Sequence, residues 1–302
     1  MQKPLLASFA VLLMSSSSVF SQAIPSSASS QMPFFAGETA DCTPAVPTGP
    51  CSGESGQAAP GYYVGIFGGG GGSSNTHATQ SGTALFPVGG PPDGLGPLSV
   101  NADGNMRSSG TYLGGFQIGH EWSGLPLGTG WALLPALEYE AYYLGDTQNG
   151  YLINPTPRLD EHDFLVSLPT DTGVFLANAV VSLNSPVRNI YPYIGAGVGS
   201  AVMSIHGANS AQLAPPEPGI NHFNSDPNAS SWAFATQGKA GVRFALSDHW
   251  NLFGEYRYLY IGSTEYVFGS TQYPTHIPTT PWNMHLGGIS QNVAVLGLQY
   301  RF

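Results

Sequence analysis

Residues 292–302 read NVAVLGLQYRF, and this C-terminal run carries the clearest structural pattern of the chain. A period of two in side-chain character is the pattern of a β-strand whose faces meet different surroundings. One face carries Asn292, Ala294, Leu296, Leu298, Tyr300 and Phe302, and the other carries Val293, Val295, Gly297, Gln299 and Arg301. The stretch therefore predicts a terminal strand with one apolar face and one face that includes charge.

The same alternation recurs upstream and predicts an all-β, antiparallel protein of about eight strands. It is clearest in 131–144, 231–246 and 249–262, weaker in 108–122, 173–184 and 190–205, and glycine-rich in 61–69. In 249–262, for example, Trp250 and Leu252 share a face opposite Glu255 and Arg257.

The connections between these segments alternate in length. Those at 123–130, 184–189 and 246–249 are short, whereas those at 70–107, 145–172, 206–230 and 263–287 are long and polar or Gly/Pro-rich. Short turns at one end and long loops at the other are typical of a transmembrane up-and-down β-barrel. We therefore expect four long extracellular loops and three short periplasmic turns around eight strands.

Composition excludes two other classes of protein. Charged residues make up 9% of the chain and the net charge is −10, which argues against nucleic-acid binding. No stretch reaches 18 apolar residues, so a spanning helix is not expected.

The charges that do occur in the strands fall on the face opposite the large apolar residues, which predicts a charged lumen. An eight-stranded barrel is just wide enough inside to be filled by side chains, so we expect a packed ion-pair network with Glu138 and Glu140 facing Lys239 and Arg243. The predicted network comprises Glu121, Glu138, Glu140, Lys239, Arg243, Glu255, Arg257 and Arg301.

Aromatic residues gather at both ends of the segments, as they do in the interface belts of membrane barrels. One group lies near the short turns: Trp122, Trp131, Trp250, Tyr300 and Phe302. The other lies toward the long connections: Tyr142, Tyr143, Trp232, Tyr256, Tyr258 and Tyr260.

The N-terminal region predicts export. Lys3, an apolar run from Leu5 to Met14 and small residues before position 24 form a signal peptide over 1–23, which precedes a flexible Ser/Pro/Gly-rich extension over 24–59. Cys42 and Cys51 in that extension are expected to form a local disulfide, with a metal site as the weaker alternative. The barrel is expected to span 60–302.

Three stretches resemble a known family. The run from Ala294 to Phe302 resembles the terminal strand of Gram-negative outer-membrane barrels, while Pro192–Gly199 and Leu252–Tyr258 are similar to strands of opacity-type surface proteins of the OmpA/OmpX-like group. The resemblance implies an eight-stranded barrel in the outer membrane, in contact with lipid and lipopolysaccharide. It also implies recognition of the strand ending in Phe302 by the barrel-assembly machinery.

The residues favour a structural or adhesive surface protein that contacts a host or cell-surface ligand through its loops, with a small-solute porin as the alternative. An enzyme is not favoured. The His-x-Ser pair of lipid A deacylases is absent from the sequence, and the Asp160-Glu161-His162-Asp163 run is more typical of a solvated loop than of an omptin site. The histidines His77, His206, His222, His276 and His285 stand singly in the long connections. We therefore expect neither a metal site nor a cofactor.

Overall fold

The computed structural model describes residues 60–302, except for 109, 129, 157, 159–161 and 185–188. The predicted signal peptide, the extension over 24–59 and the Cys42–Cys51 pair lie outside the described residues. Within the described part of the chain, no helix is long and apolar enough to cross a membrane.

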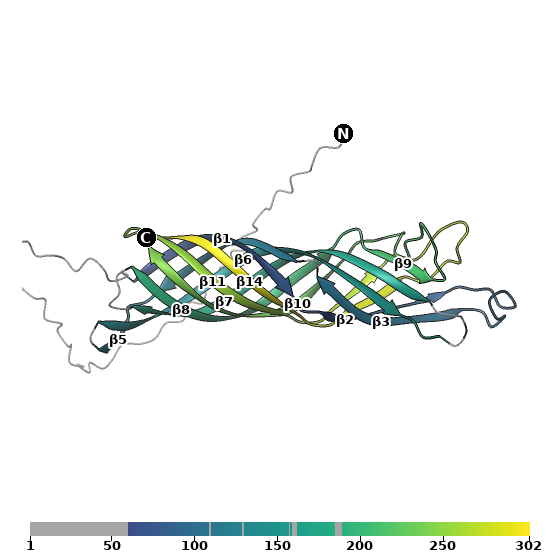
Figure 1. Cartoon of the computed structure of the whole chain (residues 1–302), viewed down its shortest axis with the longest axis horizontal. Helices are drawn as coiled ribbons and strands as arrows, with labels where there is room; N and C mark the ends of the chain where they lie inside the picture. The colour runs from purple at the N-terminus through teal and green to yellow at the C-terminus, as the bar shows by residue number, and fades with distance from the viewer. Residues whose placement is uncertain (1–59, 109, 129, 157, 159–161, 185–188) are drawn as a thin grey trace, which may run out of the picture. The chain divides into compact units, whose positions relative to one another are not determined.

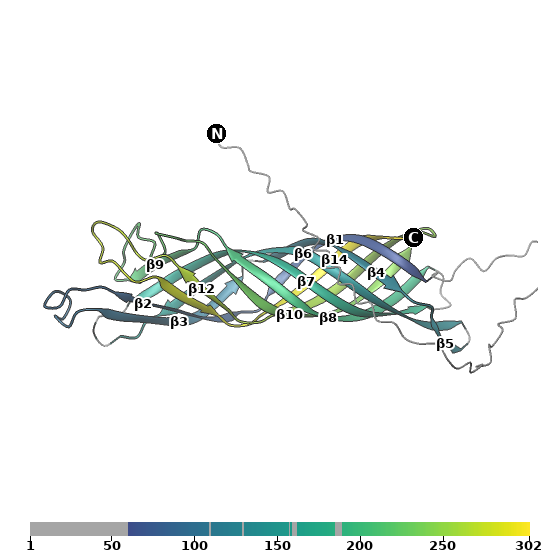
Figure 2. The same ribbon diagram turned by 180° about the vertical axis from the view of Figure 1, so that it is seen from behind.

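Within the described residues, eight strands pair in a closed antiparallel ring, and the barrel that they form can be followed in Figures 1 and 2. In ring order they are β1 (Gly61–Ser73), β4 (Thr111–Glu121), β6 (Trp131–Ile153), β7 (Asp163–Asn184), β8 (Ile190–Ile205), β10 (Ala229–Ala245), β11 (Trp250–Ile261) and β14 (Ile289–Arg301). β14 pairs back onto β1 from Tyr63 opposite Arg301 to Ser73 opposite Gln291, which closes the ring. The predicted eight-stranded antiparallel barrel is confirmed.

The barrel presents its large apolar side chains outward. Ile66, Ile194 and Leu296 on three different strands are 66%, 66% and 68% exposed. The side chains of their neighbours in sequence point inward and are buried, as Phe67, Tyr193 and Val295 show. A soluble barrel places its polar face outside, so an outer surface of this kind requires a hydrocarbon environment.

The two ends of the barrel differ. At one end, β5 (Leu125–Gly128) forms a short hairpin with the start of β6, and residues 246–249 make a tight turn. Phe302 lies at the same end. We call this the turn end. Figures 1 and 2 show β2, β3, β9 and β12 gathered at the opposite end, which we call the loop end.

The expectation that the long connections are loops is wrong for much of their length. β6 extends into the second long connection as far as Ile153, and β7 already begins at Asp163. Five further strands lie in the long connections: β2 (Thr76–Ala84), β3 (Leu98–Ser108), β9 (Asn209–Ala214), β12 (Thr264–Phe268) and β13 (Trp282–Leu286). With the outer parts of β6 and β7 they form a sheet in the order β12-β13-β2-β3-β6-β7-β9. The barrel wall thus continues beyond the eight-stranded ring as a folded sheet.

The loop-end sheet has an apolar interior of its own. Phe164, Trp282 and Leu152 are at most 1% exposed, and Phe223 stacks on Phe268 with ring centroids 4.4 Å apart. Burial of side chains this large stabilises the sheet by about 1.5–3 kcal/mol each. This packing explains how strands without a clear apolar alternation are held in place.

A closed barrel should resist SDS at room temperature, because every transmembrane strand satisfies its backbone groups with two neighbours. We expect the unheated protein to run as a compact band and the boiled protein to run at a different apparent mass. Gel electrophoresis with and without boiling measures this. Identical mobility in the two lanes would contradict a closed barrel.

Candidate functional site

The structure places all eight predicted lumen charges inside the barrel. None of them is more than 6% exposed. Four carboxylates face four cations, and these cations are half of the 8 lysines and arginines in the whole chain. Strand alternation explains the inward direction, since the residues beside them, such as Tyr139 and Tyr256, are exposed on the outer surface.

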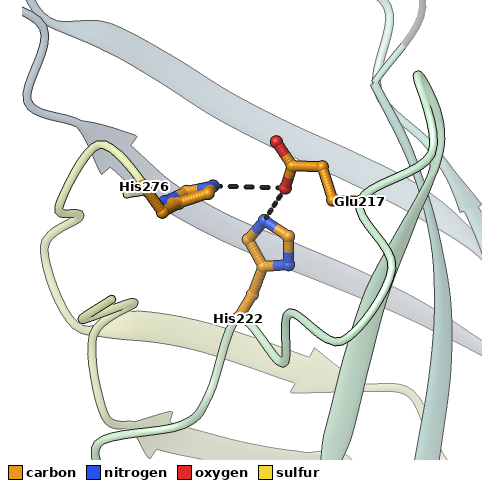
Figure 3. A group of neighbouring side chains, drawn as sticks. All are labelled: Glu217, His222 and His276. Carbon is orange, nitrogen blue, oxygen red and sulfur yellow. Dashed lines mark hydrogen bonds and ion pairs between the residues drawn. The ribbon is translucent and has the colours of Figure 1, made fainter. Parts of the chain in front are cut away.

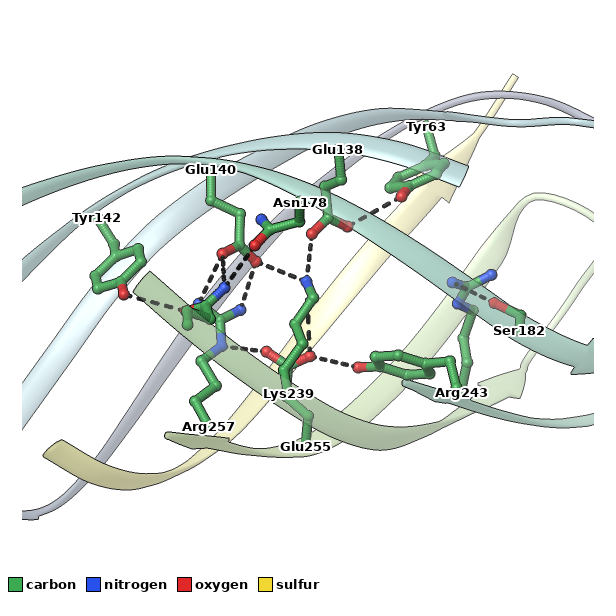
Figure 4. A network of polar contacts seen from close by, with 12 residues as sticks. Tyr63, Glu138, Glu140, Tyr142, Asn178, Ser182, Lys239, Arg243, Glu255 and Arg257 are labelled. Atoms are coloured by element: carbon green, nitrogen blue, oxygen red, sulfur yellow. Dashed lines mark hydrogen bonds and ion pairs between the residues drawn. The ribbon is translucent and has the colours of Figure 1, made fainter. Parts of the chain in front are cut away.

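Five of the charges form a mid-barrel cluster: Glu138, Glu140, Lys239, Glu255 and Arg257 (Figure 4). The Lys239 ammonium contacts Glu138 and lies 2.9 Å from Glu140 Oε1. Arg257 Nη2 lies 2.9 Å from the same Glu140 oxygen, and Arg257 also pairs with Glu255. Each carboxylate therefore has at least one cationic partner, which is what a buried charge requires.

The other three charges form a turn-end cluster. Arg243 Nη1 lies 3.0 Å from Glu121 Oε2, and Arg301 Nη2 lies 2.6 Å from Glu121 Oε1. The expectation that Arg243 faces Glu138 and Glu140 is wrong. Arg243 lies four residues beyond Lys239 on β10, or roughly 13 Å along the strand, and so reaches the level of Glu121 instead.

Two tyrosines connect the clusters, and sequence reasoning missed both. Tyr63 donates a hydrogen bond to Glu138 Oε2 at 3.0 Å, and Tyr193 donates to Glu255 Oε2 at 2.6 Å. The Arg243 guanidinium carbon lies 5.8 Å and 5.4 Å from the centroids of these two rings. Tyr193 could have been found from its alternation with Ile194, but Tyr63 lies in the glycine-rich segment that alternation does not orient.

Neutral side chains complete the filling of the lumen. Gln237 Nε2 donates to Glu140 at 2.6 Å and to Asn178 Oδ1 at 3.0 Å, and Ser182 donates to Glu121 at 3.3 Å. The ring of Phe67 lies under the Arg257 guanidinium, 4.0 Å from centroid to carbon. A solute that passed along the barrel axis would have to displace these paired groups.

The predicted interface aromatics lie on the outer surface of the barrel, with one exception, although Tyr256 lies at the level of the mid-barrel cluster and not at an end. At the turn end, the Tyr300 ring lies 5.0 Å from Trp250 and 5.2 Å from Phe302. The remaining predicted interface residues are exposed outside the barrel: Trp122, Trp131, Tyr143, Trp232, Tyr256, Tyr258 and Tyr260. Tyr142 does not belong to this set, because its side chain points inward and donates to Gln237 at 3.2 Å.

A second polar group lies at the loop end and consists of Glu217, His222 and His276 (Figure 3). The first two come from the connection between β9 and β10, and His276 comes from the connection between β12 and β13. Nε2 of His276 lies 3.2 Å and Nε2 of His222 lies 3.5 Å from Oε2 of Glu217. The expectation that the histidines stand singly is wrong for these two, because the loop-end sheet folds the two connections together.

The hydrogen bonds of the two imidazoles define their tautomers. Nδ1 of His222 lies 3.0 Å from the Ser210 carbonyl oxygen, and Nδ1 of His276 lies 2.6 Å from that of Ile277. A carbonyl oxygen can only accept, so each Nδ1 carries a hydrogen and donates it. Both Nε2 atoms are then directed at one carboxylate oxygen.

The electrostatics of the group follow from burial and from these contacts. The hydrogen bond to His276 lowers the pKa of Glu217, and the same contact raises the pKa of His276. Burial lowers the pKa of His222, which favours its neutral form.

The group opens into a pocket of about 230 Å³. His162, from the Asp160–Asp163 run, also lines this pocket, whereas Asp160 and Glu161 lie outside the described residues. Phe164 and Trp282 form apolar walls, with ring centroids 5.1 Å and 5.8 Å from that of His222. The pocket thus combines three histidines, a carboxylate and other polar side chains with apolar walls.

The family model described as outer membrane protein beta-barrel domain matches residues 51–302. Three solved structures resemble the chain at low identity. Neisserial surface protein A is 15% identical over 80% of this chain and 97% of its own, with a TM-score of 0.33. The outer membrane protein OprG from Pseudomonas aeruginosa is 13% identical over 82% and 98%, with a TM-score of 0.33. The outer membrane protease OmpT from Escherichia coli is 10% identical over 83% and 99%, with a TM-score of 0.35.

Comparison with curated proteins finds no match. The assignment rests on the family model, which covers the whole described barrel and agrees with its eight antiparallel strands and apolar outer surface. The chain belongs to the outer membrane protein beta-barrel domain family and is an outer-membrane β-barrel.

Proposed function

We propose that this protein is a structural or adhesive surface protein, without catalytic activity, whose barrel serves as a closed membrane anchor for the loop-end sheet. The observation that carries the proposal is the packed interior. Four carboxylates and four cations compensate one another at mid-barrel and at the turn end, and apolar side chains fill the loop end. In barrels of this kind the long connections face the outside of the cell, so the loop end would be extracellular.

An apolar tip at the loop end supports the adhesive part of the proposal. Leu85, Val88 and Leu95 in the connection between β2 and β3 are 45%, 82% and 70% exposed. Arg158 braces this tip, since its Nε lies 2.6 Å from Asp93 Oδ2 and its Nη1 donates to the Pro97 carbonyl at 2.7 Å. The guanidinium lowers the pKa of Asp93 to about 2. An ordered, exposed apolar surface is typical of a protein contact.

Planar-bilayer recording of the refolded protein tests the closed anchor. We expect negligible conductance, because the paired charges occupy the lumen. Stable single-channel steps whose ion selectivity changes in a Lys239→Met variant would support the small-solute porin instead. Steps that Lys239→Met leaves unchanged would point to leakage around the barrel and not through it.

Attachment of cells that display the protein tests the adhesive role. We expect the Val88→Ser, Leu95→Ser double variant to reduce attachment to immobilised matrix proteins and glycans at least several-fold, because it removes the apolar tip. Val267→Ser on β12 is the matched control, since Val267 is 63% exposed but lies away from the tip. Equal attachment by all three proteins would contradict a role for this tip.

A further inference from the structure

We propose that Glu217, His222 and His276 bind a divalent transition metal of the Zn²⁺ type at the loop end. This inference is independent of whether the barrel conducts. It rests on the ligand set, on the spacing of the ligand atoms, on the hydrogen bonds behind them and on the pocket in front.

The ligand set and spacing fit zinc. Two imidazole nitrogens and one carboxylate are the protein ligands of a common zinc site, which leaves a fourth position open. With metal–ligand bonds of about 2.0–2.1 Å, tetrahedral ligands lie about 3.4 Å apart. The two observed separations from Glu217 Oε2 are 3.2 Å and 3.5 Å, and all three ligand atoms lie within 4.8 Å of one another.

The hydrogen bonds behind the ligands are those of a metal site. Metal-binding histidines donate their other ring N–H to a carbonyl or carboxylate, which orients the ring and directs the free nitrogen at the metal. His222 does this through the Ser210 carbonyl and His276 through the Ile277 carbonyl. The two Nε2 atoms are thus both directed at the Glu217 carboxylate, and the three ligand atoms lie close enough together for one metal ion to gather them.

The surroundings allow a metal to enter and remain. The His222 side chain is 3% exposed, whereas those of His276 and Glu217 are 16% and 29% exposed toward the pocket. His162 lines the same pocket and can supply a fourth ligand, or water can occupy that position. Bound metal would join the β9–β10 connection to the β12–β13 connection, which already contact each other through Gly269 N and Asp226 O at 2.8 Å.

The test is calorimetric titration of the refolded full chain with Zn²⁺ in detergent micelles. We expect one Zn²⁺ per chain, and we expect Glu217→Gln and His276→Gln each to weaken binding at least tenfold. Removal of a hydrogen-bond partner behind a ligand already weakens metal binding roughly 10–100-fold, and removal of a direct ligand should weaken it at least as much. Both residues are partly exposed, so the variants should fold, and their heat-modifiable gel mobility checks this.

The matched control is His285→Gln. His285 also pairs with a glutamate, since its Nδ1 lies 2.7 Å from Glu265 Oε1, but the pair stands alone on the exposed surface. We expect this variant to bind Zn²⁺ as tightly as the original protein. An equal loss in the control, unchanged binding in the two ligand variants, or no stoichiometric binding at all would overturn the proposal.

Co²⁺ provides a second measurement that needs no variant. Visible absorption typical of four-coordinate Co²⁺ with nitrogen and oxygen ligands is expected when Co²⁺ replaces Zn²⁺. A thiolate-to-cobalt charge-transfer band would instead assign the metal to Cys42 and Cys51 and would overturn the loop-end site.

Discussion

Replacement of Lys239 by methionine is expected to lower the free energy of unfolding by about 3–5 kcal/mol, the usual cost of removing one partner from a buried ion pair. Methionine fills similar space but carries no charge. Without the ammonium, Glu138 loses its cationic partner, and Glu140 retains only Arg257. The Lys239 and Glu138 side chains are 1% and 3% exposed, so water cannot replace the lost contact.

Urea unfolding of the refolded protein, followed by tryptophan fluorescence, measures this change. Arg158→Met is the matched control, because it removes the cation of the Asp93–Arg158 pair, whose side chains are 25% and 24% exposed. An exposed pair contributes about 0–1 kcal/mol, so this variant should unfold almost as the original protein does. Equal shifts in the two variants would mean that the lumen charges are solvated.

A second substitution separates the loss of charge balance from the loss of packing. In the Lys239→Met background, Glu138→Gln removes the carboxylate that has lost its partner while keeping an acceptor for the Tyr63 hydroxyl. The double variant should therefore be more stable than Lys239→Met alone. A further fall in stability would show that packing, and not charge balance, accounts for the effect of the single variant.

The location of these charges could be predicted from local alternation, whereas their pairing could not. A period of two assigns each residue to a face, and it placed Glu121, Lys239 and Arg257 inside without knowledge of the neighbouring strands. Which residues meet across the lumen depends on the stagger between strands. Stagger brings Arg243 to Glu121 instead of Glu138, and no local feature of the sequence specifies it.

The loop end could not be predicted, for two physical reasons. β2 reads THATQSGTA, and its inward residues Thr76, Ala78 and Gln80 differ little in polarity from its outward ones, so alternation gives no signal. The histidine pair was missed because His222 and His276 belong to different connections. Their contact depends on the order of strands in the loop-end sheet, which becomes apparent only once the chain is folded.

Glycines in β1 lie where β1 pairs with β14 and closes the barrel, and we expect their replacement to be strongly destabilising. A methyl group added to Gly71 would collide with the carbonyl oxygen of Asn292, and one added to Gly69 would collide with that of Ala294. Both obstacles are backbone atoms of β14, which pairs with β1 along this edge. Backbone cannot move aside without loss of the pairing, so the glycines allow the two strands to approach.

Gly71→Ala is therefore expected to destabilise the barrel by at least about 1–3 kcal/mol, the usual cost of overpacking. Gly72→Ala, one residue further along the same strand, is the control, because a methyl group there meets no atom within 4 Å. The folded fraction after refolding, read from heat-modifiable gel mobility, should fall for Gly71→Ala and stay unchanged for Gly72→Ala. The Gly69→Ala, Gly71→Ala double variant should lose a large part of its free energy of unfolding, which is roughly 5–15 kcal/mol for a typical folded protein. Equal folded fractions for Gly71→Ala and Gly72→Ala would show that β1 and β14 can separate at this edge without opening the barrel.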